Sequence, residues 1–133
     1  MCLEALIQID EQAPRRIGAR RLSELSGLVI TSASLDGTSA LHVSVSGGCS
    51  CELLAKGANA EGPTWTLEPE YRPKLETLIR ALASEAGKFR VLFHWLNGDI
   101  ERTVARVGTK DFLKLLAADE IGNNVLYQVS GKA

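Results

Sequence analysis

The chain has 133 residues, of which 45% are apolar and 23% are charged, and its 15 basic and 16 acidic side chains give a formal net charge of -1. This composition excludes an intrinsically disordered chain, and no uncharged apolar run is long enough to span a membrane. The length predicts a single domain, residues 1–133, and the charge balance predicts neither a nucleic-acid nor a membrane partner.

The N-terminal segments predict a strand followed by a short helix. Residues 3–9 alternate between apolar and mostly polar side chains, which is typical of a half-buried strand. Residues 15–26 carry apolar side chains at spacings that fit a short helix, and Gly27 is placed to end it.

A hairpin is predicted next. Residues 28–34 and 40–46 are rich in β-branched side chains and flank the turn-forming pair Asp36 and Gly37. The following segment, residues 47–68, is rich in glycine and poor in charge, and its Cys49–Leu54 stretch fits either a helical turn or a strand.

The clearest helix covers residues 70–86, where apolar side chains recur on one stripe. Pro73 must lie in its first turn, because proline in a helix interior costs about 3 kcal/mol. The segment from Phe89 to Leu96 is apolar on both faces, which predicts a central strand.

The dipeptide Asn97-Gly98 predicts a tight hairpin that returns through residues 99–107. In that hairpin His94 pairs with Glu101. Thr109 is then expected to cap a helix that ends near Ala118.

A last strand is expected from Val125 to Val129. Strands interrupted by single helices predict an α+β fold: a two-layer sandwich with an antiparallel or mixed sheet and two or three helices on one face.

Cys49 and Cys51 form the most suggestive local pair, because two thiolates two residues apart can bind a soft metal. A structural zinc site needs four ligands, so His42 or another side chain would have to join them. A redox role is also conceivable, although the one-residue spacer and the acidic neighbour Glu52 disfavour a reactive thiolate. The alternative is that the thiols are buried packing groups, and no cofactor is predicted.

Nucleophilic catalysis needs a nucleophile, a base and an orienting group. Cys49 or Cys51, with His94 and Glu101, supplies these groups, which defines a small Cys/His hydrolase as a further alternative. No cysteine-peptidase or serine-hydrolase signature accompanies them, so His94 could equally be a sheet residue paired with a carboxylate.

A two-layer sandwich leaves one sheet face open, and on that face Leu92, His94 and Leu96 form an apolar surface. Together with Trp65 they are candidate ligand or interface residues, and they predict a homodimer or a protein partner. The leading hypothesis is therefore a non-catalytic protein-binding or self-associating module rather than an enzyme.

Two broader expectations follow from composition. Three cysteines give no disulfide framework and the first residues lack a secretory signal pattern, which predicts a cytoplasmic protein. Residues 37–68 are poor in charge, whereas residues 88–133 carry seven basic and five acidic side chains. The functional surface is expected in the charge-poor middle segment.

Overall fold

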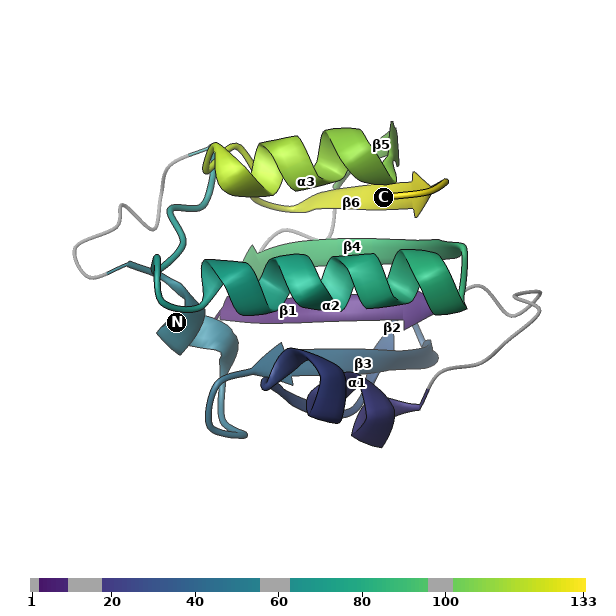
Figure 1. The fold of residues 1–133 in the computed structure, drawn as a ribbon. Helices are drawn as coiled ribbons and strands as arrows, with labels where there is room; N and C mark the ends of the chain where they lie inside the picture. Colours follow the sequence, from purple (N-terminus) through teal and green to yellow (C-terminus); the bar gives the residue numbers. More distant parts are fainter. Residues whose placement is uncertain (1–2, 10–17, 56–62, 96–101) are drawn as a thin grey trace.

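The computed structural model of the chain describes residues 3–9, 18–55, 63–95 and 102–133. Within these residues, six strands form one mixed sheet, and three α-helices cover one face of it (Figure 1). The elements in chain order are β1 (Leu3–Ile9), α1 (Ala19–Ser26), β2 (Val29–Leu35), β3 (Thr38–Ser44), the 3-10 helix η1 (Ser50–Leu53), α2 (Arg72–Glu85), β4 (Lys88–Trp95), β5 (Thr103–Gly108), α3 (Thr109–Ala117) and β6 (Val125–Ser130). The α+β two-layer sandwich with a mixed sheet is confirmed.

Local signals in the sequence explain most of these elements. The hairpin between β2 and β3 turns at Asp36 and Gly37, whose φ angles of 52° and 78° are those of a type I′ turn. Gly27 ends α1 in the left-handed region, and Pro73 lies in the first turn of α2, where its missing N–H costs nothing. In the described part of the chain, no helix has the length and apolar character needed to cross a membrane.

The strand order is β2-β3-β1-β4-β6-β5, which corrects the predicted pairing after β4. β4 is central, as expected, but β6 rather than β5 lies beside it, and β5 pairs with β6 in parallel. α3 joins these two parallel strands, so β5, α3 and β6 form a βαβ unit. The predicted hairpin between β4 and β5 is therefore wrong, and its turn at Asn97 and Gly98 lies outside the described residues.

The predicted cap of α3 also differs. Gly108 is the N-cap residue, and Thr109 is already the first residue of the helix. The Thr109 hydroxyl donates to the carbonyl of Gly131 at 2.7 Å, just beyond the end of β6. Thr109 thus ties the start of α3 to the neighbouring strand instead of capping the helix.

The main core lies between the helices and one sheet face. Each helix contributes fully buried side chains: Leu22 from α1, Leu78 and Leu82 from α2, and Phe112 and Leu116 from α3. The alternate residues of β6 face this core, namely Val125, Tyr127 and Val129. The helical layer covers the sheet from α1 to α3 in Figure 1.

The second face of the sheet is not open, because the sheet curls onto itself. Arg102, just before β5, donates from Nη1 to Asp36 Oδ2 at 3.1 Å, although β5 and the β2–β3 hairpin lie at opposite ends of the strand order. In a flat six-stranded sheet the two edges would be roughly 24 Å apart. Strong twist brings the β2–β3 turn and the start of β5 together. A second buried cluster lies on this face and is made of Leu6, Leu35, Ala40 and Leu92.

Because of this curl, the described part of the apolar surface expected on the second face of the sheet is not exposed. Leu92 is 0% exposed and Leu6 is 2% exposed, so neither is available to a partner. The homodimer was inferred from an uncovered sheet face. It stays a prediction, and the buried second face does not support it.

Replacing Leu92 with Ala should lower the free energy of unfolding by about 2–5 kcal/mol, because the truncation leaves a cavity under the curled sheet. Val104→Ala is the matched control: Val104 lies in the same cross-strand row but is 55% exposed, so its loss should cost less than about 1 kcal/mol. Urea unfolding followed by circular dichroism measures both values. Equal, small losses would mean that the second face is not packed.

Candidate functional site

The segment that contains Cys49 and Cys51 completes the edge of the sheet. β3 pairs with β1 only from Ala5 onward, so the start of β1 needs other hydrogen-bond acceptors on that side. The short helix η1 supplies them: the Leu3 amide donates to Cys51 Sγ at 3.2 Å, and the Ala5 amide donates to Ser50 Oγ at 3.0 Å. Of the two forms the sequence allowed, the segment adopts the helical turn, and the Cys51 sulfur has a structural partner.

Ser50, between the two cysteines, contacts His42 in an arrangement that does not suit catalysis. Ser50 is fully buried, and its hydroxyl donates to the Val43 carbonyl. A hydroxyl has one proton, so the 3.2 Å contact with His42 Nε2 must be a hydrogen bond that the imidazole donates. A catalytic base would have to accept the serine proton instead. His42 and Ser50 therefore hold η1 against β3.

The other predicted catalytic histidine, His94, pairs with a carboxylate of β1. The cross-strand partner of His94 is Glu4 on β1, with Nε2 and Oε1 2.9 Å apart, which matches the predicted alternative of a sheet histidine paired with a carboxylate. Glu101 lies outside the described residues. Among the described residues, no group of three or more His, Cys, Asp and Glu side chains is arranged to hold a metal ion.

Two of the four predicted interface residues, Trp65 and Leu92, are buried in the described structure. Trp65 is 2% exposed and packs edge-to-face on Trp95, with ring centroids 5.1 Å apart. Leu92 is part of the second buried cluster, and Leu96 lies outside the described residues. Trp65 and Leu92 therefore contribute to packing in this chain.

A groove of about 420 Å³ lies at the end of the sheet where β4 begins and β5 and β6 end. We call it the basic groove. Its lining residues are Lys88, Phe89, Arg90, Arg106, Gln128, Val129 and Ser130. Three of them are cationic and none is acidic, so the groove favours an anion.

The cations of the basic groove stand on paired strands in a defined order. Four polar residues are successive cross-strand neighbours on the curled face: Gln8, Arg90, Gln128 and Arg106. The two arginines are therefore two strands apart, about 10 Å between their backbones. A neutral glutamine between them avoids the repulsion of like charges directly opposite each other.

Glutamine side chains also orient both guanidinium groups. Arg90 Nη1 donates to Gln8 Oε1 at 3.0 Å, and Gln8 in turn donates to the Ser39 carbonyl at 3.3 Å. Arg106 Nε donates to Gln128 Oε1 at 3.2 Å. Each bond from an arginine to a glutamine uses one of the five N–H donors of the guanidinium group. The arginines are thus positioned by neutral acceptors and retain their full charge.

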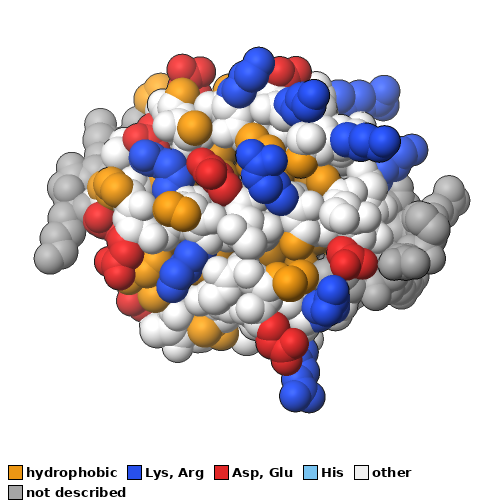
Figure 2. All heavy atoms as spheres, viewed as in Figure 1, with side chains coloured by type: hydrophobic (Ala, Val, Ile, Leu, Met, Phe, Trp, Pro, Cys, Tyr) orange, Lys and Arg blue, Asp and Glu red, His pale blue; other side chains and the backbone are white. Residues whose placement is uncertain are grey.

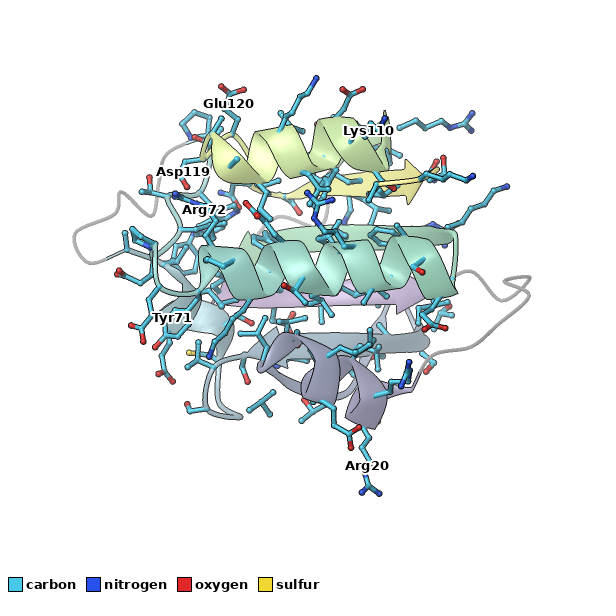
Figure 3. All side chains as sticks on the ribbon, in the orientation of Figure 1. Arg20, Tyr71, Arg72, Lys110, Asp119 and Glu120 are labelled. Atoms are coloured by element: carbon cyan, nitrogen blue, oxygen red, sulfur yellow. The ribbon has the colours of Figure 1, made fainter. Side chains whose placement is uncertain are left out.

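A second hollow, of about 710 Å³, has the opposite charge and lies near the start of α2. Its lining includes the carboxylates of Glu52, Glu68 and Glu70 around Tyr71. Burial and these carboxylates raise the pKa of the Tyr71 phenol above its ordinary value of 10.0. Figure 3 shows Tyr71 on one side of the start of α2, while Arg72 points away from it toward Asp119 at 2.6 Å.

Two regions of opposite charge lie at different ends of the molecule. Figure 2 shows a group of Lys and Arg side chains at the end where α3 begins and β6 ends; acidic side chains lie at the opposite end and also elsewhere on this face. Lys110, labelled in Figure 3, stands at the basic end. The basic groove comes from the basic C-terminal third, not from the charge-poor middle segment that the sequence favoured.

Sequence reasoning missed the basic groove because its residues come from three strands. Lys88 and Arg90 alternate with Phe89 and Val91, which is a visible signal for a charged strand face. Arg106 joins them only because β5 lies parallel to β6, and no local pattern shows that pairing.

The chain matches no known protein-family model, no curated protein and no solved structure. Its site must therefore be interpreted from its own chemistry.

Replacing Ser50 with Ala should lower the free energy of unfolding by about 1–3 kcal/mol, because the Ala5 amide, the Val43 carbonyl and the His42 imidazole all lose a buried partner. The matched control is Ser34→Ala on the exposed side of β2, which should change stability by less than about 0.5 kcal/mol. Chemical denaturation measures both variants. If the Ser50→Ala protein is as stable as the control variant, the hydrogen bonds of Ser50 do not stabilise the edge of the sheet.

Tyr71 should ionise above pH 10, and Glu70→Gln should bring its pKa back toward 10.0 because one repelling charge is lost. Glu24→Gln, on α1, is the matched control and should leave the titration unchanged. Carbon-13 NMR of the tyrosine rings resolves Tyr71 from Tyr127. Since the folded state keeps the phenol protonated longer, stability from this group is complete below pH 10 and falls as the pH rises through the higher folded pKa. A Tyr71 pKa at or below 10.0 would contradict the acidic surroundings.

Proposed function

We propose that this chain is a non-catalytic protein-binding domain, and that its basic groove binds a carboxylate-rich segment of a partner protein. The observation that carries the proposal is the groove itself: Lys88, Arg90 and Arg106 line it, and none of its other described lining residues is acidic. Such a set of cations creates a local positive potential that attracts an anionic partner.

The groove geometry suits carboxylates. Guanidinium groups bind carboxylates through two parallel N–H···O bonds, and the glutamines hold both arginines in place before a partner arrives. Their positions on paired strands limit the ordering cost of binding. Exposed ion pairs contribute about 0.2–1 kcal/mol each, so a few of them predict weak, transient and salt-sensitive binding.

Two observations favour a protein over a nucleic acid. Binders of single-stranded nucleic acids present aromatic side chains on which bases stack, but the one aromatic residue that lines the groove, Phe89, is 2% exposed. Opposite the basic end, the carboxylates of Glu52, Glu68 and Glu70 would repel a long polyanion. A short acidic segment fits a local groove on a chain of nearly neutral net charge.

The non-catalytic part of the proposal is supported by the hydrogen bonds of the histidines. His42 donates to Ser50, and His94 pairs with Glu4. We retain the cytoplasmic location as part of the proposal, on the cysteine argument from the sequence alone.

Binding of a hexaglutamate peptide tests this function. The Nε–H NMR signals of Arg90 and Arg106 should shift on titration at low salt, and the shifts should shrink at physiological salt. The double variant Arg90→Gln/Arg106→Gln should raise Kd by more than about two-fold and by up to roughly thirty-fold, because two exposed ion pairs of about 0.2–1 kcal/mol each are lost.

The matched control is Arg20→Gln/Arg80→Gln, which removes the same charge from exposed positions on α1 and α2. It should leave Kd within about two-fold of the original protein. An equal loss in both double variants would mean that only net charge matters. Tighter binding of a single-stranded oligonucleotide than of the acidic peptide would overturn the choice of a protein partner.

A further inference from the structure

We infer that the acidic segment binds as an extended strand along the free edge of β5, so that the partner adds one strand to the sheet. This inference rests on the proposed function and specifies the conformation and sequence pattern of the partner. β5 is the last strand in the sheet order, and within the described residues no other strand pairs with its outer edge. Val104, on this strand, is 55% exposed.

The backbone of β5 is already arranged to pair with another strand. An edge strand leaves alternate N–H and C=O groups without strand partners, and an added strand satisfies them. β5 pairs with β6 over its whole length, from Thr103 to Gly108, so it is already held extended. The domain therefore needs no refolding to accept a strand, and most of the ordering cost falls on the partner.

The side chains of β5 define a pattern in the partner. Val104 continues a cross-strand row of apolar residues, and Arg106 stands two residues further along the same face and lines the basic groove. The other members of the apolar row are Leu6, Leu92 and Leu126. Because side chains alternate along a strand, an added strand places residues two apart beside Val104 and Arg106. The fitting pattern is an apolar residue and an acidic residue separated by one position.

The other edge of the sheet does not fit the same partner. β2 carries no lysine or arginine between Val29 and Leu35, and the turn at its end carries Asp36. An acidic strand beside β2 would find no cation on the strand itself, and Asp36 at its end is already paired with Arg102. Of the two described edges, β5 is thus the one that selects an acidic segment.

The test uses two peptides of equal composition, blocked at both ends. Thr-Val-Thr-Glu-Thr-Glu-Thr places valine and both glutamates on one face of a strand, and Thr-Val-Glu-Thr-Glu-Thr-Thr places the glutamates opposite the valine. The first should bind at least about three-fold more tightly, because only it presents both side chains to Val104 and Arg106 together. Equal affinities would overturn the inferred pattern.

Backbone methylation of the first peptide tests the added strand directly. One variant is N-methylated at its second and fourth residues and another at its third and fifth. Since alternate amides of a strand face opposite sides, only one variant should lose binding, while the other keeps its Kd within about two-fold. If both variants bind like the parent peptide, the segment does not pair with β5, although the basic groove still binds acidic peptides.

Substitutions in the domain test whether the exposed side chain of β5 contacts the peptide. Val104→Asp should weaken binding of the first peptide by roughly three- to ten-fold, through lost apolar contact and added repulsion. Leu25→Asp on α1 is the matched control, because Leu25 is the other large apolar residue that the described structure exposes. It should have no effect beyond about two-fold, and equal effects of the two variants would refute a role for β5. If neither peptide nor hexaglutamate binds at all, the proposed function itself fails.

Discussion

The twist of the sheet is the constraint on which the other features depend. β4 is apolar on both faces, but a single helical layer covers only one of them. Twist brings the β2–β3 turn to the start of β5, and Leu6 and Leu92 are buried between these corners. The ion pair between Arg102 and Asp36 joins these two corners. It contributes little to the free energy of unfolding, since the Asp36 side chain is 70% exposed. Burial of each leucine contributes about 1.5–3 kcal/mol, so apolar packing maintains the curl.

The curl also explains where charge can accumulate. Once the middle of the second face is buried, the ends of its strands remain as the accessible part, and at one end these carry Lys88, Arg90 and Arg106. Glutamines separate the two arginines, so the cations coexist without direct repulsion across neighbouring strands. At the opposite end three glutamates surround Tyr71. The net charge of -1 therefore describes a molecule with two charged ends.

Features encoded by short stretches could be predicted from the sequence. The alternation of residues 3–9, the apolar stripe of residues 70–86 and the turn at Asp36 and Gly37 each predict an element that the structure contains. The position of β5 could not be predicted, because Asn97-Gly98 favours a hairpin and only the long-range pairing of β6 with β4 excludes it. The basic groove depends on that same pairing, so it was missed together with the sheet order. For His94 a carboxylate partner was expected, and Glu4 on β1 provides one; Glu101 lies outside the described residues.

Positive charge on a sheet edge has two physical consequences, and they support the same interpretation. Natural proteins place cations on edge strands to prevent pairing between identical edges, because two such edges repel each other. Arg106 on β5 therefore opposes an edge-to-edge homodimer of this chain. The same charge attracts an acidic strand, and the exposed Val104 beside it adds a contact that a purely protective edge would not need. An edge that repels its own copies and retains an apolar contact is suited to a partner of different sequence and opposite charge.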